Sequence, residues 1–244
     1  MSDPVASPAA PRLKERIALV TGASRGLGRA VALRFAEEGA HVVAFARTQG
    51  ALEELDDAIR KISGSPATLI AENLTDFDKI DRVGAALHGR FGKLDILVGA
   101  AATLGQLSPL GHYSPKMWND IFNLNVHANW RLIRALDPLL RLSNAGRAVF
   151  VTSGVARDPR MYWGPYAASK AALEQMVKIY AAEVAHTSVR ANIVNPGGLR
   201  TKMRAQAFPG EDPMSLPPPE AVTEIFVALA EPACDKTGEL FKAQ

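Results

Sequence analysis

The sequence predicts an α/β fold in which about seven strands form one doubly wound parallel sheet with helices on both faces. Short apolar runs alternate along the chain with longer segments in which apolar residues recur every three or four positions. The apolar runs are continuous, which is typical of strands buried on both faces. No repeat or linker divides the 244 residues, so we expect a single domain over residues 12–244.

The expected elements follow one another in a regular order. Strands are predicted at 17–20, 42–45, 68–70, 94–98, 148–151 and 190–194. Helices are predicted at 27–38, 52–62, 117–140 and 166–185, with Pro138 interrupting only the last turn of the third. Residues 1–11 are rich in Pro, Ala and Ser and are expected to form a flexible lead-in. The Pro-rich stretch 208–219 is expected to be a surface loop.

The composition argues against several classes of function. The net charge is +3, and the 28 basic residues are scattered along the chain, so nucleic acid is not an expected partner. No apolar run approaches the roughly 20 residues of a membrane-spanning helix, and no secretory signal is recognised, so no membrane partner is expected. The single Cys234 excludes an internal disulfide and indicates a reducing compartment, so we expect a cytoplasmic protein. The five histidines lack ligand spacing, so no metal site is expected.

A glycine-rich turn joins the first predicted strand to the first predicted helix. Residues 21–28 carry three glycines in the spacing G-x-x-x-G-x-G. Such glycines let backbone N–H groups and the helix N-terminus approach a pyrophosphate, although three glycines can also form an ordinary strand–helix turn. The position of the turn favours a Rossmann-type nucleotide site. Its expected cofactor contacts are Gly22, Ser24, Arg25, Gly26, Leu27 and Gly28.

The end of the second predicted strand indicates which nucleotide is bound. An NAD site usually has an acidic residue there to bind the ribose hydroxyls. Here Arg47 follows the strand, and no acid appears before Glu53. Arg25 and Arg47 together could flank a 2′-phosphate, although either arginine alone is more often a solvated surface residue. We therefore expect NADP(H) to be preferred over NAD(H).

Tyr166 and Lys170 form a Y-x-x-x-K pair at the start of the last predicted helix. This spacing places the phenol and the ammonium on one helical face. A free tyrosine has a pKa of about 10, and a nearby cation is expected to lower it toward neutral pH. Ser153 follows the fifth predicted strand, where its hydroxyl could hydrogen-bond a substrate carbonyl. By itself, this pair is equally consistent with two surface residues of an ordinary amphipathic helix.

Together with the glycine turn, these residues resemble the short-chain dehydrogenase/reductase family over about residues 13–240. The order Asn125, Ser153, Tyr166, Lys170 and the 13-residue step from Ser153 to Tyr166 fit the family's pattern. The stretch 195–213 is similar to that of a little-characterised bacterial branch of the family.

The resemblance implies hydride transfer between NADP(H) and a small-molecule carbonyl or secondary alcohol substrate. It implies that Tyr166 is the general acid or base and that Ser153 positions the carbonyl oxygen. Lys170 would hold the nicotinamide ribose and lower the pKa of Tyr166, and Asn125 would hold a relay water. Cofactor contacts are then expected from Arg47, Asn73, Leu74, Ala100, Ala101, Tyr166, Lys170, Pro196, Gly197 and Thr201.

Three departures from the family's pattern have consequences. The stretch 99–102 reads Gly-Ala-Ala-Ala where the family has Asn-Asn-Ala-Gly, so the side-chain support that asparagine gives the sheet is expected to be lost. Asn73 stands in place of an aspartate near the adenine, and its amide still donates and accepts hydrogen bonds. The usual terminal Gly-Gly is missing from the printed sequence. We expect a homo-oligomer, with a dimer favoured over a tetramer.

Other residues leave alternatives open. Tyr162 and Trp163 could form a wall of the substrate pocket or belong to the core, and Arg157 and Arg160 could bind an anionic substrate or be solvated loop residues. The segment 199–216 is expected to be a mobile lid, because it follows the Pro-Gly loop and is dense in Pro and Gly. A nucleotide-binding sensor or scaffold without turnover is the alternative to an enzyme, and only the altered stretch 99–102 favours it.

Overall fold

The computed structural model describes residues 10–244, which contain a single seven-stranded parallel sheet in the order β3-β2-β1-β4-β5-β6-β7. This arrangement confirms the predicted fold class. The crossover from β3 to β4 places β1 and β4 side by side at the point where the strand order reverses, and such a switch point is where doubly wound sheets bind ligands. The strands are β1 (Ile17–Thr21), β2 (His41–Ala46), β3 (Thr68–Ala71), β4 (Ile96–Gly99), β5 (Arg147–Val151), β6 (Arg190–Asn195) and β7 (Leu240–Lys242).

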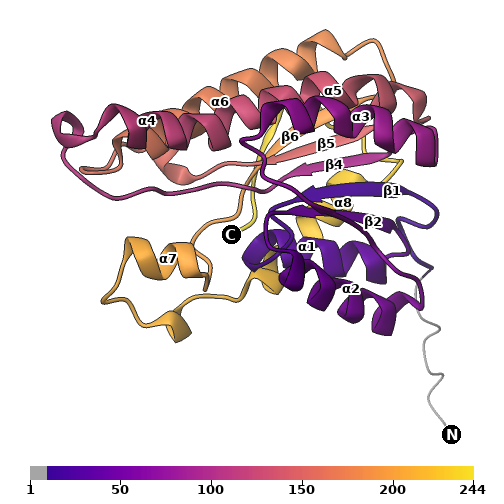
Figure 1. The fold of residues 1–244 in the computed structure, drawn as a ribbon, viewed down its shortest axis with the longest axis horizontal. Coiled ribbons are helices and arrows are strands. Elements are labelled where there is room, and N and C mark those ends of the chain that lie inside the picture. Colours follow the sequence, from indigo (N-terminus) through magenta and orange to yellow (C-terminus); the bar gives the residue numbers. More distant parts are fainter. Residues whose placement is uncertain (1–9) are drawn as a thin grey trace, which may run out of the picture.

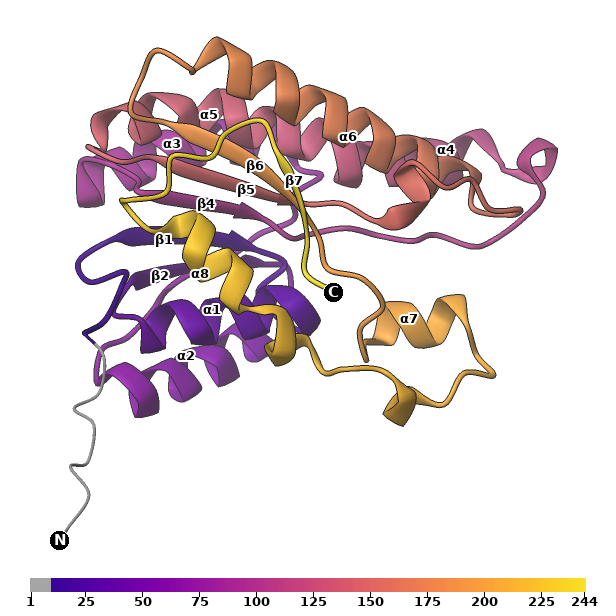
Figure 2. The same ribbon diagram turned by 180° about the vertical axis from the view of Figure 1, so that it is seen from behind.

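Helices cover both faces of the sheet (Figures 1 and 2). One layer contains α1 (Gly26–Glu37), α2 (Gln49–Ser63) and α8 (Glu224–Ala230). The other contains α3 (Phe77–Phe91), α4 (Pro115–Phe122), α5 (Ala128–Leu142) and α6 (Gly164–Glu183). Successive residues of β1 feed the two cores alternately, since Ala18 and Val20 pack in the first layer and Leu19 in the second. No helix among residues 10–244 is long and apolar enough to span a membrane.

The predicted helix 117–140 is interrupted, which corrects the expectation of one regular helix. A five-residue π-helical segment, Asn123–His127, joins α4 to α5. Pro138 lies inside α5, which continues to Leu142. Apolar periodicity does not reveal a π segment, because the chain remains helical on both sides of it.

Four elements were missing from the sequence-based expectation: α3, α7 (Lys202–Ala207), α8 and β7. α7 has six residues, α8 has seven and β7 has three, too few to show a clear period. α3 buries Ile80, Val83 and Leu87 at helical spacing, so the sequence does contain the apolar period of this helix.

The predicted lead-in, residues 1–11, lies largely outside the described residues. The Arg12 guanidinium donates to both Glu38, the residue after α1, and Glu224 of α8. The nearest of these contacts, from Nη1 to Glu224 Oε1, is 2.7 Å. This network ties the start of β1 to the first helical layer.

The segment after β6 leaves the body of the molecule before it returns as α8. Figures 1 and 2 show α7 and the turns that follow it standing off from both helical layers. The Pro-rich stretch 208–219 contains no strand or α-helix, as expected for a surface loop, and it holds the short 3-10 turn Pro213–Ser215. Gln206 anchors α7 to the loop after β4, because its Nε2 donates to Gly105 O at 2.7 Å.

Candidate active site

A cavity of about 860 Å³ lies at the carboxyl ends of the central strands. All of the residues expected to bind the cofactor line it: Gly22, Ser24, Arg25, Gly26, Leu27, Gly28, Arg47, Asn73, Leu74, Ala100, Ala101, Tyr166, Lys170, Pro196, Gly197 and Thr201. Ser153 lines it too, whereas Asn125 does not. Sequence reasoning missed several further lining residues, including Arg29, Leu104, Lys202, Met203 and Arg204.

The glycine turn between β1 and α1 has the backbone that a phosphate cradle needs. Gly22 and Gly26 have φ angles of 69° and 55°, in the left-handed region that favours glycine. A Cβ atom on Gly28 would clash with the carbonyl oxygen of Gly22. α1 begins with no side-chain cap and no acidic residue in its first turn, so its first N–H groups remain open to an anion. These residues therefore fit the pyrophosphate of a dinucleotide.

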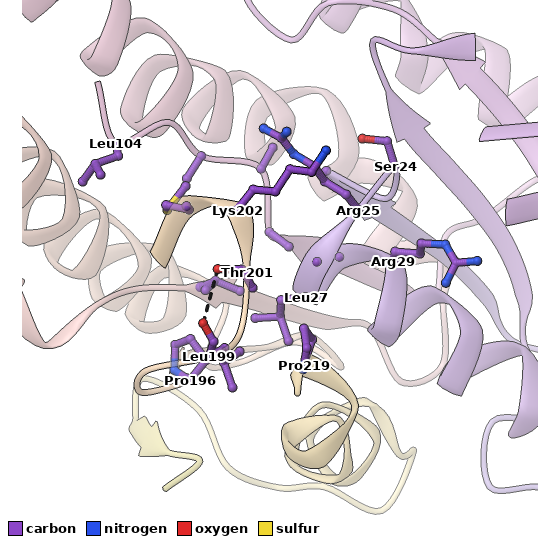
Figure 3. Close-up of a pocket in the computed structure, with 18 of the residues that line it drawn as sticks. Ser24, Arg25, Leu27, Arg29, Leu104, Pro196, Leu199, Thr201, Lys202 and Pro219 are labelled. Carbon is purple, nitrogen blue, oxygen red and sulfur yellow. Dashed lines mark hydrogen bonds between the residues drawn. The ribbon is translucent and has the colours of Figure 1, made fainter. Parts of the chain in front are cut away.

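Basic side chains surround the cradle. Arg25 and Arg47 are both exposed at the cavity, and Arg29 also lines it. Figure 3 shows Lys202, from the start of α7, extending toward Arg25. Two separate segments of the chain thus bring positive charge to the same part of the cavity, which suits a polyanionic ligand. No sequence pattern places Lys202 at this site, because more than 170 positions separate it from Arg25.

The altered stretch Gly99–Ala102 has no asparagine side chain, and a threonine of β1 makes hydrogen bonds to its backbone and to Val98. The buried Thr21 hydroxyl donates to Val98 O at 3.2 Å and accepts from the backbone N–H groups of Ala100 and Ala101. A Cβ on Gly99 would overlap the Phe150 ring and lie 2.8 Å from Asn129 Oδ1. A side chain at position 99 would therefore displace its neighbours, and the Thr21 hydroxyl adds to the backbone pairing of β1 and β4 at the switch point.

Tyr166 lies in the first turn of α6 with its ring buried against Met203 and Trp163. Its hydroxyl is 4.0 Å from Met203 Sδ, and its ring centroid is 5.9 Å from that of Trp163. Burial raises the pKa of Tyr166 to about 12, and a hydrogen bond with the Ser153 side chain opposes that rise. The phenol is therefore protonated at neutral pH.

Lys170 lies one turn further along α6 and is 2% exposed. Its Nζ donates to Val151 O at 2.8 Å and stands 5.8 Å from the centroid of the Tyr166 ring. Burial lowers the pKa of Lys170 to about 8. The expectation that Lys170 lowers the pKa of Tyr166 is not met by this arrangement, because burial of the phenol dominates and raises its pKa.

Asn125 lies in the π segment, and its side chain binds protein groups rather than facing the cavity. Its Oδ1 accepts from Thr103 N at 2.9 Å, and its Nδ2 donates to Thr103 O and to Ser169 Oγ, each at 3.0 Å. Ser169 in turn donates to Tyr166 O at 2.7 Å. The Asn125 side chain thus fixes the loop after β4 against the first turn of α6, and the relay water expected at Asn125 stays a prediction.

Ser153 is positioned by the end of β5 and by a buried carboxylate. The neighbouring Thr152 donates its hydroxyl to Glu174 at 2.8 Å, and Arg157 donates to the same carboxylate at 3.1 Å. Arg157 is therefore engaged with the protein and not with an anionic substrate. Trp163 lines the cavity, as predicted if it forms a wall of the substrate pocket. Tyr162 is 54% exposed and lies neither in the cavity wall nor in the core.

Comparisons with known proteins agree with this geometry. Residues 16–212 match the family model described as short chain dehydrogenase. The uncharacterised oxidoreductase YciK of Escherichia coli is 38% identical over 95% of this chain and 93% of its own length. A solved short chain dehydrogenase of Salmonella enterica serovar Typhi superposes with a TM-score of 0.94 at 37% identity, covering 98% of this chain and 99% of that one.

A second solved structure carries a ligand. It is a short chain dehydrogenase of Escherichia coli CFT073 in complex with NADPH, with a TM-score of 0.92 and 37% identity over 97% of this chain and 100% of that one. Family, fold and the arrangement of the cavity therefore lead to the same conclusion. The chain belongs to the short-chain dehydrogenase/reductase family and is an NAD(P)-dependent oxidoreductase.

Proposed function

We propose that the protein is an NADP(H)-dependent carbonyl reductase, which also oxidises the corresponding secondary alcohol. The observation that carries this proposal is the buried Tyr166 hydroxyl, placed in the cavity beside Ser153 and one helical turn from Lys170. These three side chains come from the loop after β5 and from α6, and Lys170 of α6 donates to Val151 at the end of β5. A rigid acid, a hydroxyl donor and a cation are what the reduction of a carbonyl requires.

The cavity fits a nicotinamide dinucleotide. The turn Gly22–Gly28 and the N-terminus of α1 would hold the pyrophosphate, and Arg25 and Arg47 would hold a 2′-phosphate, since no acid occupies the end of β2. The solved relative in complex with NADPH, and one of Shigella flexneri in complex with NADP, support this choice. Bound there, the nicotinamide supplies or accepts the hydride.

The residues of this chain then supply the proton and the orientation. Ser153 donates a hydrogen bond to the substrate carbonyl oxygen, and Tyr166 donates its proton to that oxygen as negative charge develops on it. A pKa of about 12 keeps the Tyr166 phenol protonated at neutral pH, which suits the direction of reduction. Lys170, whose Nζ stands 5.8 Å from the centroid of the Tyr166 ring, offsets only part of the cost of forming the buried phenolate.

The experiment that tests this function compares Tyr166→Phe with the wild type. We expect loss of a positioned acid to lower kcat by about 100- to 10,000-fold, with unchanged NADPH affinity, because the phenyl ring keeps its place in the core. Consumption of NADPH is followed by absorbance with a panel of ketones and aldehydes. Tyr180→Phe, on the same helix, is the matched control, because its hydroxyl binds Asp137 and lies outside the cavity. Full activity of Tyr166→Phe would contradict the proposal, and tight NADPH binding without turnover by the wild type would favour a nucleotide sensor.

We also propose that the protein assembles as a homo-oligomer through α5 and α6 and resides in the cytoplasm. Trp130 of α5 and Ile179 of α6 are 46% and 51% exposed, which is unusual for such large apolar side chains and is typical of an interface. Sedimentation of the purified protein and of Trp130→Glu tests the assembly, and the variant is expected to sediment as a smaller species. Cell fractionation tests the location.

A further inference from the structure

The part of the cavity beyond Tyr166 is apolar. Leu104, Val155 and Tyr166 form a small buried cluster of their own, separate from the two cores beside the sheet. Trp163 and Met203 pack against this cluster and also line the cavity. Because Met203 Sδ is 4.0 Å from the Tyr166 hydroxyl, this apolar surface begins directly at the proton donor.

A cation beside Met203 is neutralised by an ion pair. Arg204, which follows Met203 in α7, makes a bidentate pair with Glu211, with both N–O distances at 2.6 Å. Its guanidinium also lies over the Phe208 ring, 3.9 Å from the centroid. The pair holds the pKa of the Glu211 carboxyl below its usual range, so the carboxylate is charged at neutral pH. Arg204 therefore has little capacity left to bind an anionic substrate.

Three other cations of the cavity are engaged or directed elsewhere. Lys170 donates to the backbone of β5, and Figure 3 shows Lys202 extending toward Arg25 and away from Leu104. Arg200 Nη1 lies 2.9 Å from Met214 Sδ, and Arg157 binds the buried Glu174 and does not line the cavity. A carboxylate placed on Leu104, Trp163 and Met203 would thus lose solvation without gaining an ion-pair partner from these side chains.

The loops before α4 and before α6 are joined to each other at Tyr162 and carry exposed apolar side chains. Leu110 and Met161 are 67% and 80% exposed, and the φ of Tyr162 is 75°. The Tyr162 carbonyl accepts from Ser108 N at 3.1 Å and from the Tyr113 hydroxyl at 2.6 Å. These bonds hold a strained backbone in place.

We propose that the substrates are uncharged ketones or aldehydes with an apolar aryl or alkyl group, and that the Arg204–Glu211 pair excludes carboxylate-bearing analogues. The apolar group would lie on Leu104, Trp163 and Met203, with the carbonyl oxygen at Ser153 and Tyr166. This inference rests on the proposed function, because it names the substrate class of the same site. It goes beyond that function in assigning selectivity to an ion pair that no catalytic step uses.

The first test compares acetophenone with para-acetylbenzoate, which differ only by the carboxylate. We expect kcat/KM with NADPH to be at least about 100-fold higher for acetophenone. Methyl hexyl ketone, which carries an alkyl group, should also be preferred over para-acetylbenzoate. Faster reduction of para-acetylbenzoate than of both neutral ketones would overturn the inference.

The second test releases Arg204 from its partner. Glu211→Gln keeps the size of the side chain and removes its charge, so the preference for acetophenone over para-acetylbenzoate should shrink by about tenfold. Asp120→Asn is the matched control, because it breaks a carboxylate–lysine pair with Lys116 on α4, outside the cavity. An unchanged preference in Glu211→Gln would show that the pair does not set the selectivity.

A binding measurement separates failure of this inference from failure of the proposed function. Calorimetry on Tyr166→Phe loaded with NADPH gives the Kd of each ketone without turnover. Tighter binding of acetophenone than of para-acetylbenzoate, with no reduction of either by the wild type, would refute the reductase but keep the apolar site. Failure of both neutral ketones to bind would refute the apolar site, whatever the enzyme reduces.

Discussion

Replacing Lys170 by methionine tests whether a charged lysine is held in the core at a cost to stability. Lys170 is 2% exposed, and burial lowers its pKa from the ordinary value of 10.5 to about 8. Above a pH of about 8, Lys170 releases its proton in the folded protein. In the unfolded chain the same lysine keeps its proton up to a pH of about 10.5. The unfolded state therefore binds more protons in this window, and stability rises with pH.

The magnitude follows from the two pKa values. Their difference corresponds to about 3 kcal/mol at 1.36 kcal/mol per pKa unit, of which most should be gained by pH 10. We therefore expect the free energy of unfolding of the wild type to rise by about 2–3 kcal/mol relative to Lys170→Met between pH 7 and pH 10. Comparing the two proteins removes the contributions of groups that titrate in both.

Urea unfolding at several pH values, followed by circular dichroism, measures this difference. Lys178→Met is the control, because Lys178 is an exposed lysine of the same helix, and this variant should follow the wild type. If the difference in free energy of unfolding between wild type and Lys170→Met does not change with pH, burial does not lower the pKa of Lys170. Lys170→Met should also lose turnover, since the cation behind Tyr166 is removed.

Three further outcomes are expected. Arg47→Ala should weaken NADP⁺ binding by about 10- to 100-fold and leave NAD⁺ binding unchanged, measured by calorimetry; equal affinity of the wild type for the two cofactors would refute the assignment. Thr21→Val should lower the free energy of unfolding by roughly 1–3 kcal/mol in urea titrations, because the N–H groups of Ala100 and Ala101 lose their acceptor. Segment 199–216 should exchange its amide hydrogens faster than β5 and become protected when NADP⁺ and a ketone bind, because α7 stands off from both helical layers and none of its six residues is buried; full protection without ligand would argue against a lid.

The parts of the site that depend on local spacing could be predicted from the sequence. The turn from Gly22 to Gly28 and the pair Tyr166 and Lys170 each lie within eight residues, so strand–turn–helix geometry and helical periodicity suffice to place them. Their positions along the cavity follow from the parallel sheet, because the carboxyl ends of the strands meet at one edge.

The parts that depend on tertiary packing could not be predicted in this way. The hydrogen bond from Thr21 to Val98 joins residues that are 77 positions apart, and Arg204 enters the cavity on a helix of six residues. The pKa of Tyr166 was expected to fall because only the charge of Lys170 was considered, whereas the degree of burial sets its direction. Burial of a given side chain is a property of the packed chain and has no local signature.

The π segment between α4 and α5 has a consequence for how this enzyme tolerates change. A π segment arises when a helix carries one residue more than a regular α-helix needs. Deleting one residue between positions 123 and 127 would let the helix close into regular α geometry, and it would rotate Asn125 away from Thr103 and Ser169. A shorter and more regular helix would thus release the loop after β4 from α6, so the irregularity is what keeps that loop beside Tyr166.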